Sequence, residues 1–175
     1  MNWQEHLRAQ GYAHFAGITP EHLLRSAHKA IDLDLSSNYD PQRQLEYDNQ
    51  SFCPDLRGSP PIINLLIESP ILKVLDEAFG LEKIAWDKGQ IAIRRAHNTP
   101  KPSPPVAHID GFSSGLNGLD EGKIYNHTVT VGVFLTPTTT VFAGNFTVWP
   151  ASHYIYERYF RERGPRAMKE PMPTL

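Results

Sequence analysis

The sequence predicts an α+β protein in which helices come first and strands follow, an order that also fits a barrel buttressed by helices. Apolar residues in the first part of the chain recur at helical spacing, and from about residue 83 the period changes to two. Alternating βαβ units, which are typical of a parallel sheet, are not seen.

The front part of the chain is expected to be helical behind one short strand. The triplet Thr19-Pro20-Glu21 supplies a cap, a first-turn proline and a first-turn acid, and so predicts the start of a helix. In chain order, the expected elements are a strand at 11–17, this helix, a loop at 38–57, a helix from Ser59-Pro60 through Ile67, and a helix from Ser69-Pro70 that Gly80 closes.

Strands are expected in the second half of the chain. Residues 128–135 alternate clearly, so that Val129, Val131, Val133 and Leu135 are expected on one face. Ile91 and Ile93 predict an earlier strand and residues 146–149 a later one, preceded by turn chemistry at Gly144-Asn145. A last helix is expected at 154–163, where Gly164-Pro165 stops it.

Length and composition favour a single globular domain. The chain has 175 residues, of which 40% are hydrophobic, and this is too short for two comfortable domains. The formal net charge is −2 with neither sign clustered, so we expect no nucleic-acid partner.

Three features predict a soluble, cytoplasmic protein. Cys53 is the single cysteine and has no internal partner for a disulfide. The N-terminus lacks the apolar segment of a signal peptide. No run approaches the roughly 18 apolar residues of a membrane span, so no membrane partner is expected either.

The stretch His108-Ile109-Asp110 is the most informative for chemistry. Residues two apart on a strand point to the same face, so an imidazole and a carboxylate would aim at one point. Together they make two thirds of the 2-His-1-carboxylate triad of non-haem iron(II) oxygenases. A His-x-Asp pair is common by chance, and a polar pair in a surface turn is the alternative.

Several motifs in order resemble the phytanoyl-CoA dioxygenase family. They are Gly11-Tyr12-Ala13-His14-Phe15, His108-Ile109-Asp110-Gly111, Val133-Phe134-Leu135-Thr136 and the run from Gly144-Asn145 to Pro150-Ala151-Ser152-His153. The resemblance implies a double-stranded β-helix (a cupin-like jelly roll) with buttressing N-terminal helices at 1–82 and the jelly roll at 83–175. It also implies iron(II) and 2-oxoglutarate as cofactors, His108 and Asp110 as metal ligands and a small-molecule substrate.

The resemblance also implies parts that this sequence does not show. Family members carry a second metal histidine and a 2-oxoglutarate-binding arginine on strands after the Pro-Gly-Ser-His turn, whereas no histidine follows His153 here. We therefore expect an incomplete jelly roll that lacks its last strands and self-associates through unpaired strands. His153 itself corresponds to the turn of the family and is expected to be structural, with a ligand role as the alternative.

The resulting functional prediction is an iron(II)- and 2-oxoglutarate-dependent oxygenase, a hydroxylase of the phytanoyl-CoA dioxygenase type. Gln90 lies where family members often place a polar residue that holds 2-oxoglutarate, and it is the cosubstrate-binding candidate. The alternative is a truncated or degenerate relative that acts as a binding or structural protein.

Overall fold

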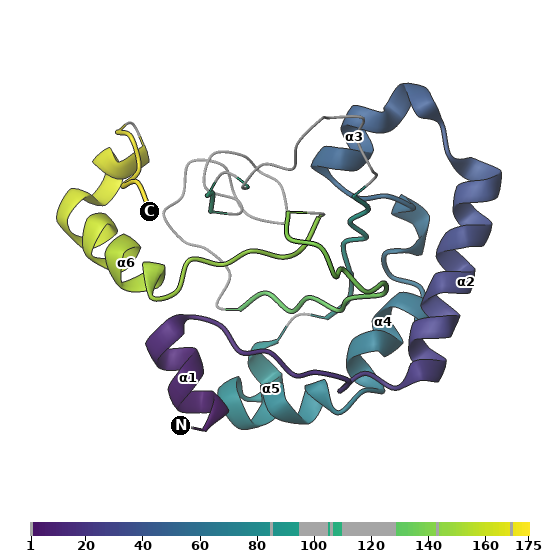
Figure 1. The fold of residues 1–175 in the computed structure, drawn as a ribbon, viewed down its shortest axis with the longest axis horizontal. Helices are drawn as coiled ribbons and strands as arrows, with labels where there is room; N and C mark the ends of the chain where they lie inside the picture. The colour runs from purple at the N-terminus through teal and green to yellow at the C-terminus, as the bar shows by residue number, and fades with distance from the viewer. Residues whose placement is uncertain are drawn as a thin grey trace. The chain divides into compact units, whose positions relative to one another are not determined.

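The computed structural model describes residues 2–84, 86–94, 105, 107–109, 129–142, 144–168 and 170–175. Its regular elements are helices, shown in Figure 1. In chain order they are α1 (Trp3–Gln10), α2 (Glu21–Asn38), η1 (Pro41–Arg43), α3 (Gln44–Asn49), η2 (Pro54–Leu56), α4 (Pro60–Ile67), α5 (Ile71–Phe79), η3 (Leu81–Lys83), α6 (Ser152–Arg163) and η5 (Gly164–Met168), where η marks a short 3-10 helix.

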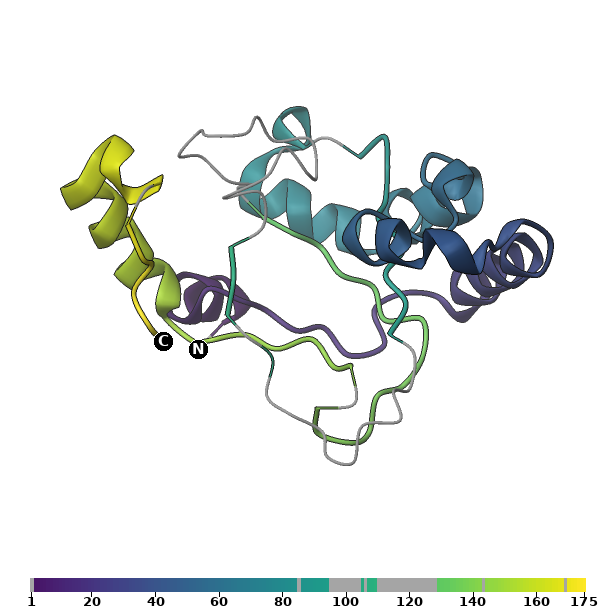
Figure 2. The same ribbon diagram turned by 90° about the horizontal axis from the view of Figure 1, so that it is seen from above.

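The jelly-roll prediction is wrong for the part of the chain that the structure describes, which contains no strand. Residues 129–142 form no helix and carry no strand arrow in either view, and the chain bends at 135–136 and turns at 141–142 (Figures 1 and 2). Residues 11–17, also expected as a strand, form no strand either. The predicted alternation is present at residues 133–135, since Val133 and Leu135 pack against the core while Phe134 is 54% exposed. It fails at Val131, which was expected on the same face and is 39% exposed. Alternation reports which side of a chain is buried, and a strand needs in addition a hydrogen-bonded neighbour.

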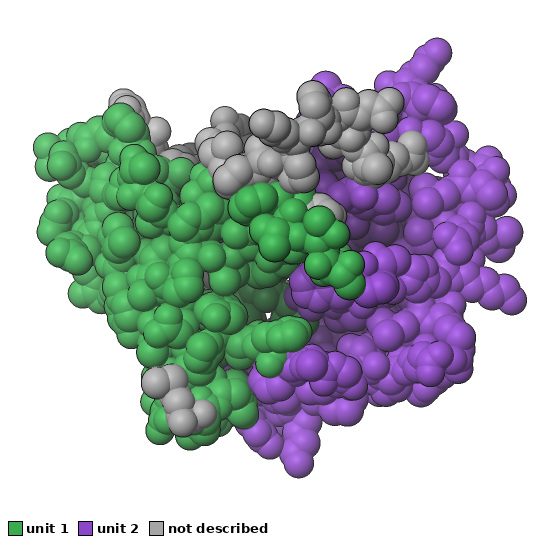
Figure 3. Space-filling model, in the orientation of Figure 1, with its two compact units in different colours: residues 1–14, 97–131, 138–175 green, residues 15–96, 132–137 purple. Residues whose placement is uncertain are grey.

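The described chain divides into two compact units, coloured in Figure 3. Unit 1 comprises residues 1–14, 97–131 and 138–175, and unit 2 comprises residues 15–96 and 132–137. Each unit is therefore built from segments that lie far apart in the sequence.

Unit 2 contains a hydrophobic core between α2 and α4. One face of α2 buries Leu23, Ala27 and Ile31 at successive spacings of four, as expected for an amphipathic helix. Ala27 is fully buried, and its small side chain allows α4 to pack closely against α2. Ile62 and Leu65 of α4 complete this contact.

A non-helical segment closes the same core. Ile91 is buried, and both its backbone groups are satisfied: its N–H donates to Ser51 Oγ at 3.0 Å and its carbonyl accepts from Phe52 N–H at 2.9 Å. His28 of α2 also bonds through Nε2 to the Leu135 carbonyl at 2.5 Å. These contacts hold the two extended segments of unit 2 against its helices.

Unit 1 joins the two ends of the chain. The α1 helix begins with a capping box, in which Asn2 Oδ1 accepts from Glu5 N–H at 2.8 Å and the Glu5 carboxylate accepts from Asn2 N–H at 3.1 Å. It ends at Gly11, whose φ is +82°. No residue of α1 is fully buried, although Trp3 and Leu7 are half-buried, and polar contacts with α6 help to position it.

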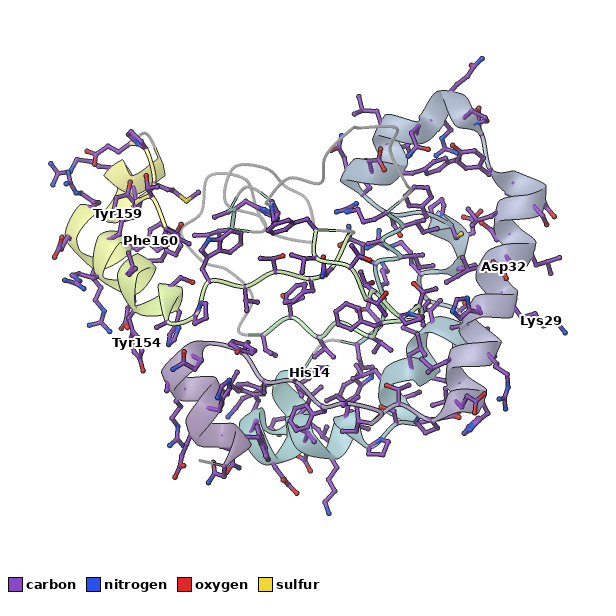
Figure 4. The ribbon with its side chains drawn as sticks, in the orientation of Figure 1. His14, Lys29, Asp32, Tyr154, Tyr159 and Phe160 are labelled. Atoms are coloured by element: carbon purple, nitrogen blue, oxygen red, sulfur yellow. The ribbon has the colours of Figure 1, made fainter. Side chains whose placement is uncertain are left out.

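The chain after α6 folds back onto that helix. Ala167 is fully buried, and the Tyr159 hydroxyl lies 3.3–3.4 Å from the carbonyls of Ala167, Glu170 and Pro171. Arg163 pairs with Glu170 at 2.9 Å. Tyr159 and Phe160 project from α6 in Figure 4, with ring centroids 5.5 Å apart.

Among the described residues, no helix has both the length and the apolar character needed to cross a membrane.

Candidate functional site

The structure describes His108 but only part of its motif. Ala107, His108 and Ile109 are non-helical; His108 is exposed, and its two neighbours are half-buried. This is the alternation on which the metal-site prediction depends, because it turns the imidazole away from the side that Ala107 and Ile109 occupy. Asp110 lies outside the described residues. The prediction that the two side chains share a face therefore stays a prediction.

Gln90, the candidate for the cosubstrate, is exposed and belongs to unit 2, whereas His108 belongs to unit 1. Its side-chain Nε2 donates to the Gln50 carbonyl at 2.5 Å. This bond orients the amide and directs one of its donors toward the backbone of the protein. The second N–H of Nε2 is the donor that remains for an oxygen of 2-oxoglutarate, which carries acceptors and no donor.

His153 has a structural contact in unit 1. Its Nε2 donates to the Arg8 carbonyl at 3.0 Å, and the Tyr154 hydroxyl donates to the same oxygen at 2.9 Å. A third hydrogen bond joins the same two helices, because the Ala151 N–H just before α6 donates to the Gln10 carbonyl of α1 at 2.9 Å. Together these three donors satisfy carbonyls at the C-terminal end of α1, which have no partner within the helix. The geometry agrees with the structural alternative for His153.

No group of three or more His, Cys, Asp or Glu side chains capable of holding a metal occurs within the described ranges. His97 and His127 lie outside those ranges, as Asp110 does. A third ligand beside His108 and Asp110 is therefore not identified from the described residues.

Neither models of known protein families, nor curated proteins, nor solved structures match this chain. The resemblance to phytanoyl-CoA dioxygenases consequently depends on the four sequence motifs alone, at residues 11–15, 108–111, 133–136 and 144–153.

A small cavity in unit 2 brings together polar and aromatic side chains that the sequence did not mark as a site. It has a volume of about 50 Å³ and lies where α2 ends, beside α3 and η2. A water needs about 10–15 Å³ measured in this way, so the cavity accommodates a few waters or one small chemical group. Its lining comprises Asp34, Leu35, Asn38, Tyr39, Arg43, Tyr47, Phe52, Cys53, Pro54 and Asp55.

Cys53 forms part of the cavity wall and is buried in an unusual backbone conformation. Its φ is +46°, in the left-handed region, and it is immediately followed by Pro54. Burial raises the pKa of the Cys53 thiol to about 12, and the neighbouring Asp34 carboxylate adds to the increase. A thiol with such a pKa stays protonated at neutral pH and is a poor nucleophile.

The charged groups around the cavity differ in whether an opposite charge neutralises them. The Arg43 guanidinium donates from Nε and Nη2 to the Glu46 carboxylate at 2.9 and 2.7 Å. This pairing raises the pKa of Arg43 and lowers the pKa of Glu46. Asp34 accepts a hydrogen bond from the Asn38 amide at 2.8 Å, and Asp55 is exposed at the start of η2.

The sequence concealed this cavity because its lining comes from 34–55, most of which was expected to be a loop. The structure instead contains η1, α3 and η2 in this stretch. The available signals were Asp40-Pro41, with a side-chain cap and a first-turn proline, and Pro54 two residues after an aromatic. Neither signal indicates that α2 and η2 come together.

Proposed function

We propose that this chain is an iron(II)- and 2-oxoglutarate-dependent oxygenase related to the phytanoyl-CoA dioxygenases, in which His108 and Asp110 ligate the metal. The observation that carries the proposal is the His-x-Asp pair within an ordered set of family-like motifs. The exposed imidazole of His108 between two half-buried neighbours supports it, because a metal ligand must be reachable.

The donor set fits iron(II) in kind. An imidazole nitrogen and a carboxylate oxygen are the ligand types of the facial triad, which leaves open positions for a cosubstrate. The number of ligands is incomplete among the described residues, which contain His108 but no cluster of three metal-binding side chains. The metal and 2-oxoglutarate together would supply oxidising chemistry, and this chain would supply two ligands and the orientation of the cosubstrate, with Gln90 as the candidate contact.

The test is anaerobic calorimetric titration of the full chain with iron(II), with and without 2-oxoglutarate. We expect weak binding that 2-oxoglutarate strengthens and that His108→Ala and Asp110→Ala both abolish, because two ligands alone leave a divalent ion largely hydrated. His22→Ala is the matched control, since it removes another exposed histidine, on α2, that is outside the motif.

Binding that survives both ligand substitutions would contradict the assignment of the site. Binding of iron(II) that 2-oxoglutarate does not strengthen would instead favour the second candidate, a non-enzymatic binding protein. The observation that favours this second candidate is the exposure of large apolar side chains, among them Val141 and Phe146 at 66% and 69%.

A further inference from the structure

The cavity at the end of α2 combines confinement with negative charge. Asp34 and Asp55 contribute two carboxylates to its lining, and the one lining cation, Arg43, has its charge matched by Glu46. The C-terminal end of an α-helix adds negative partial charge, and the last turn of α2 contains no basic residue to offset it. The local field therefore favours a cation.

Three aromatic side chains also line the cavity. Tyr47 lies between Tyr39 and Phe52, with ring centroids 5.7 and 5.5 Å away. Aromatic faces attract cations, and this cluster already does so within the protein, since the Arg43 guanidinium carbon lies 5.2 Å from the centroid of the Tyr47 ring. Aromatic walls suit a cation with C–H groups better than a hydrated metal ion, which prefers oxygen ligands all round.

We propose that this cavity binds a single small organic ammonium group, either from a free amine or from a lysine side chain of another molecule. The ammonium donates to the carboxylates of Asp34 and Asp55, and its carbon substituent contacts Tyr39. The volume of about 50 Å³ limits the ligand to a group of about the size of methylammonium. The site is separate from His108 and Asp110, because its lining residues all belong to unit 2.

The test uses the full chain labelled with ¹⁵N and titrated with methylammonium chloride, with sodium chloride at equal ionic strength as the reference. Amide shifts are expected to concentrate at residues 34–39 and 52–55. Asp34→Asn and Asp55→Asn are each expected to weaken binding about fivefold or more, since each removes a charged acceptor of a hydrogen bond. Asp55 is exposed, so its substitution tests the site even where Asp34→Asn disturbs folding.

Asp32→Asn is the matched control. Asp32 is an exposed residue of the same helix, labelled in Figure 4, and it does not line the cavity. Its substitution removes the same charge, and we expect it to change the affinity for methylammonium less than twofold. Equal weakening by Asp32→Asn and Asp55→Asn would overturn the proposal, as would shifts spread over the whole chain. Equal binding of tetraethylammonium would also overturn it, because that ion carries the same charge in a body too large for the cavity.

A capped tripeptide with a central lysine separates the two sources of the ammonium group. Binding at least tenfold tighter than that of methylammonium would support the proposal with a protein lysine as the ligand. Equal or weaker binding of the peptide, with methylammonium still bound, would support it with a free amine.

Discussion

Gly11 is constrained twice, by its backbone conformation and by a neighbouring ring. Its φ is +82°, and an added Cβ would lie 2.7 Å from His153 Nδ1. We expect Gly11→Ala to lower the free energy of unfolding by more than the roughly 1–2 kcal/mol that a left-handed residue costs. Urea denaturation measures the change.

Gly17→Ala provides the matched control for this prediction. Gly17 also has a positive φ, +65°, but nothing lies within 4 Å of an added Cβ. Gly17→Ala is expected to lower the free energy of unfolding by about 1 kcal/mol, because only the left-handed backbone conformation opposes the new side chain. If both variants lose the same stability, or if adding His153→Ala to Gly11→Ala restores none of it, the contact between Gly11 and His153 is unimportant.

Cys53 predicts a specific dependence of stability on pH. Its pKa rises from an ordinary value of 9.0 to about 12 in the folded chain. Below pH 9 the thiol is neutral in both states; between pH 9 and about 12 only the unfolded chain releases the proton, so stability falls as pH rises. The stability difference between the native chain and Cys53→Ala is expected to shrink by about 1.4 kcal/mol from pH 8 to pH 10.

Calorimetric or chemical unfolding at both pH values measures this difference. A difference that stays constant would mean that the folded thiol titrates as it does in the unfolded chain, and the burial of Cys53 would then not control its chemistry.

At the scale of single elements, α1 depends on its cap. It is a helix of eight residues with nothing buried, and such a short helix is marginal by itself. We expect Asn2→Ala to destabilise it by about 1 kcal/mol, because Asn2 satisfies the Glu5 N–H. Faster hydrogen exchange of the α1 amides measures the loss. Glu5→Gln keeps the reciprocal bond of the capping box, so unchanged exchange is expected there, and equal acceleration in both variants would contradict the role of the cap.

The helices that were predicted correctly share local signals that the structure uses. Pro60 in the first turn of α4, Pro70 just before α5, the apolar spacing of α2 and the glycine at residue 80 predicted α2, α4 and α5 to within a few residues. Gly164 predicted the end of α6. The α1 helix was missed because its residues are mostly polar and its apolar spacing is limited to one pair, Trp3 and Leu7. Its signal was the pair Asn2 and Glu5, the two members of a capping box.

The strands were mispredicted for a different reason. Ile91, Val133 and Leu135 do face the core, as alternation indicated. Pairing between strands is a long-range property, and a period of two does not specify a partner. The candidate site has the same limitation: the sequence identifies His108 as a candidate metal ligand, and only the structure shows that it is exposed. The cavity at Asp34 and Asp55 depends on contacts between separate elements, which the sequence does not specify.

At the scale of the whole molecule, the exposed apolar side chains predict self-association. They concentrate in residues 129–149, where Val131, Phe134, Val141, Phe142 and Phe146 are 39–69% exposed. We expect larger species to grow with protein concentration in sedimentation velocity experiments, and Phe146→Lys to reduce them. Leu45→Lys, at a 75% exposed position on α3, is expected to have no such effect. A monomer at all concentrations would contradict the prediction.

The bond between His153 and the Arg8 carbonyl spans 145 residues of sequence and bears on how the chain is made. On a ribosome, α1 is synthesised before α6, and its docking partner follows only after about 7–30 s of further elongation at typical rates of roughly 5–20 residues per second. Until α6 has been made, α1 lacks the contacts with α6 described above, and an isolated helix of this length is largely unfolded. Docking of α1 is therefore a late step in the folding of unit 1.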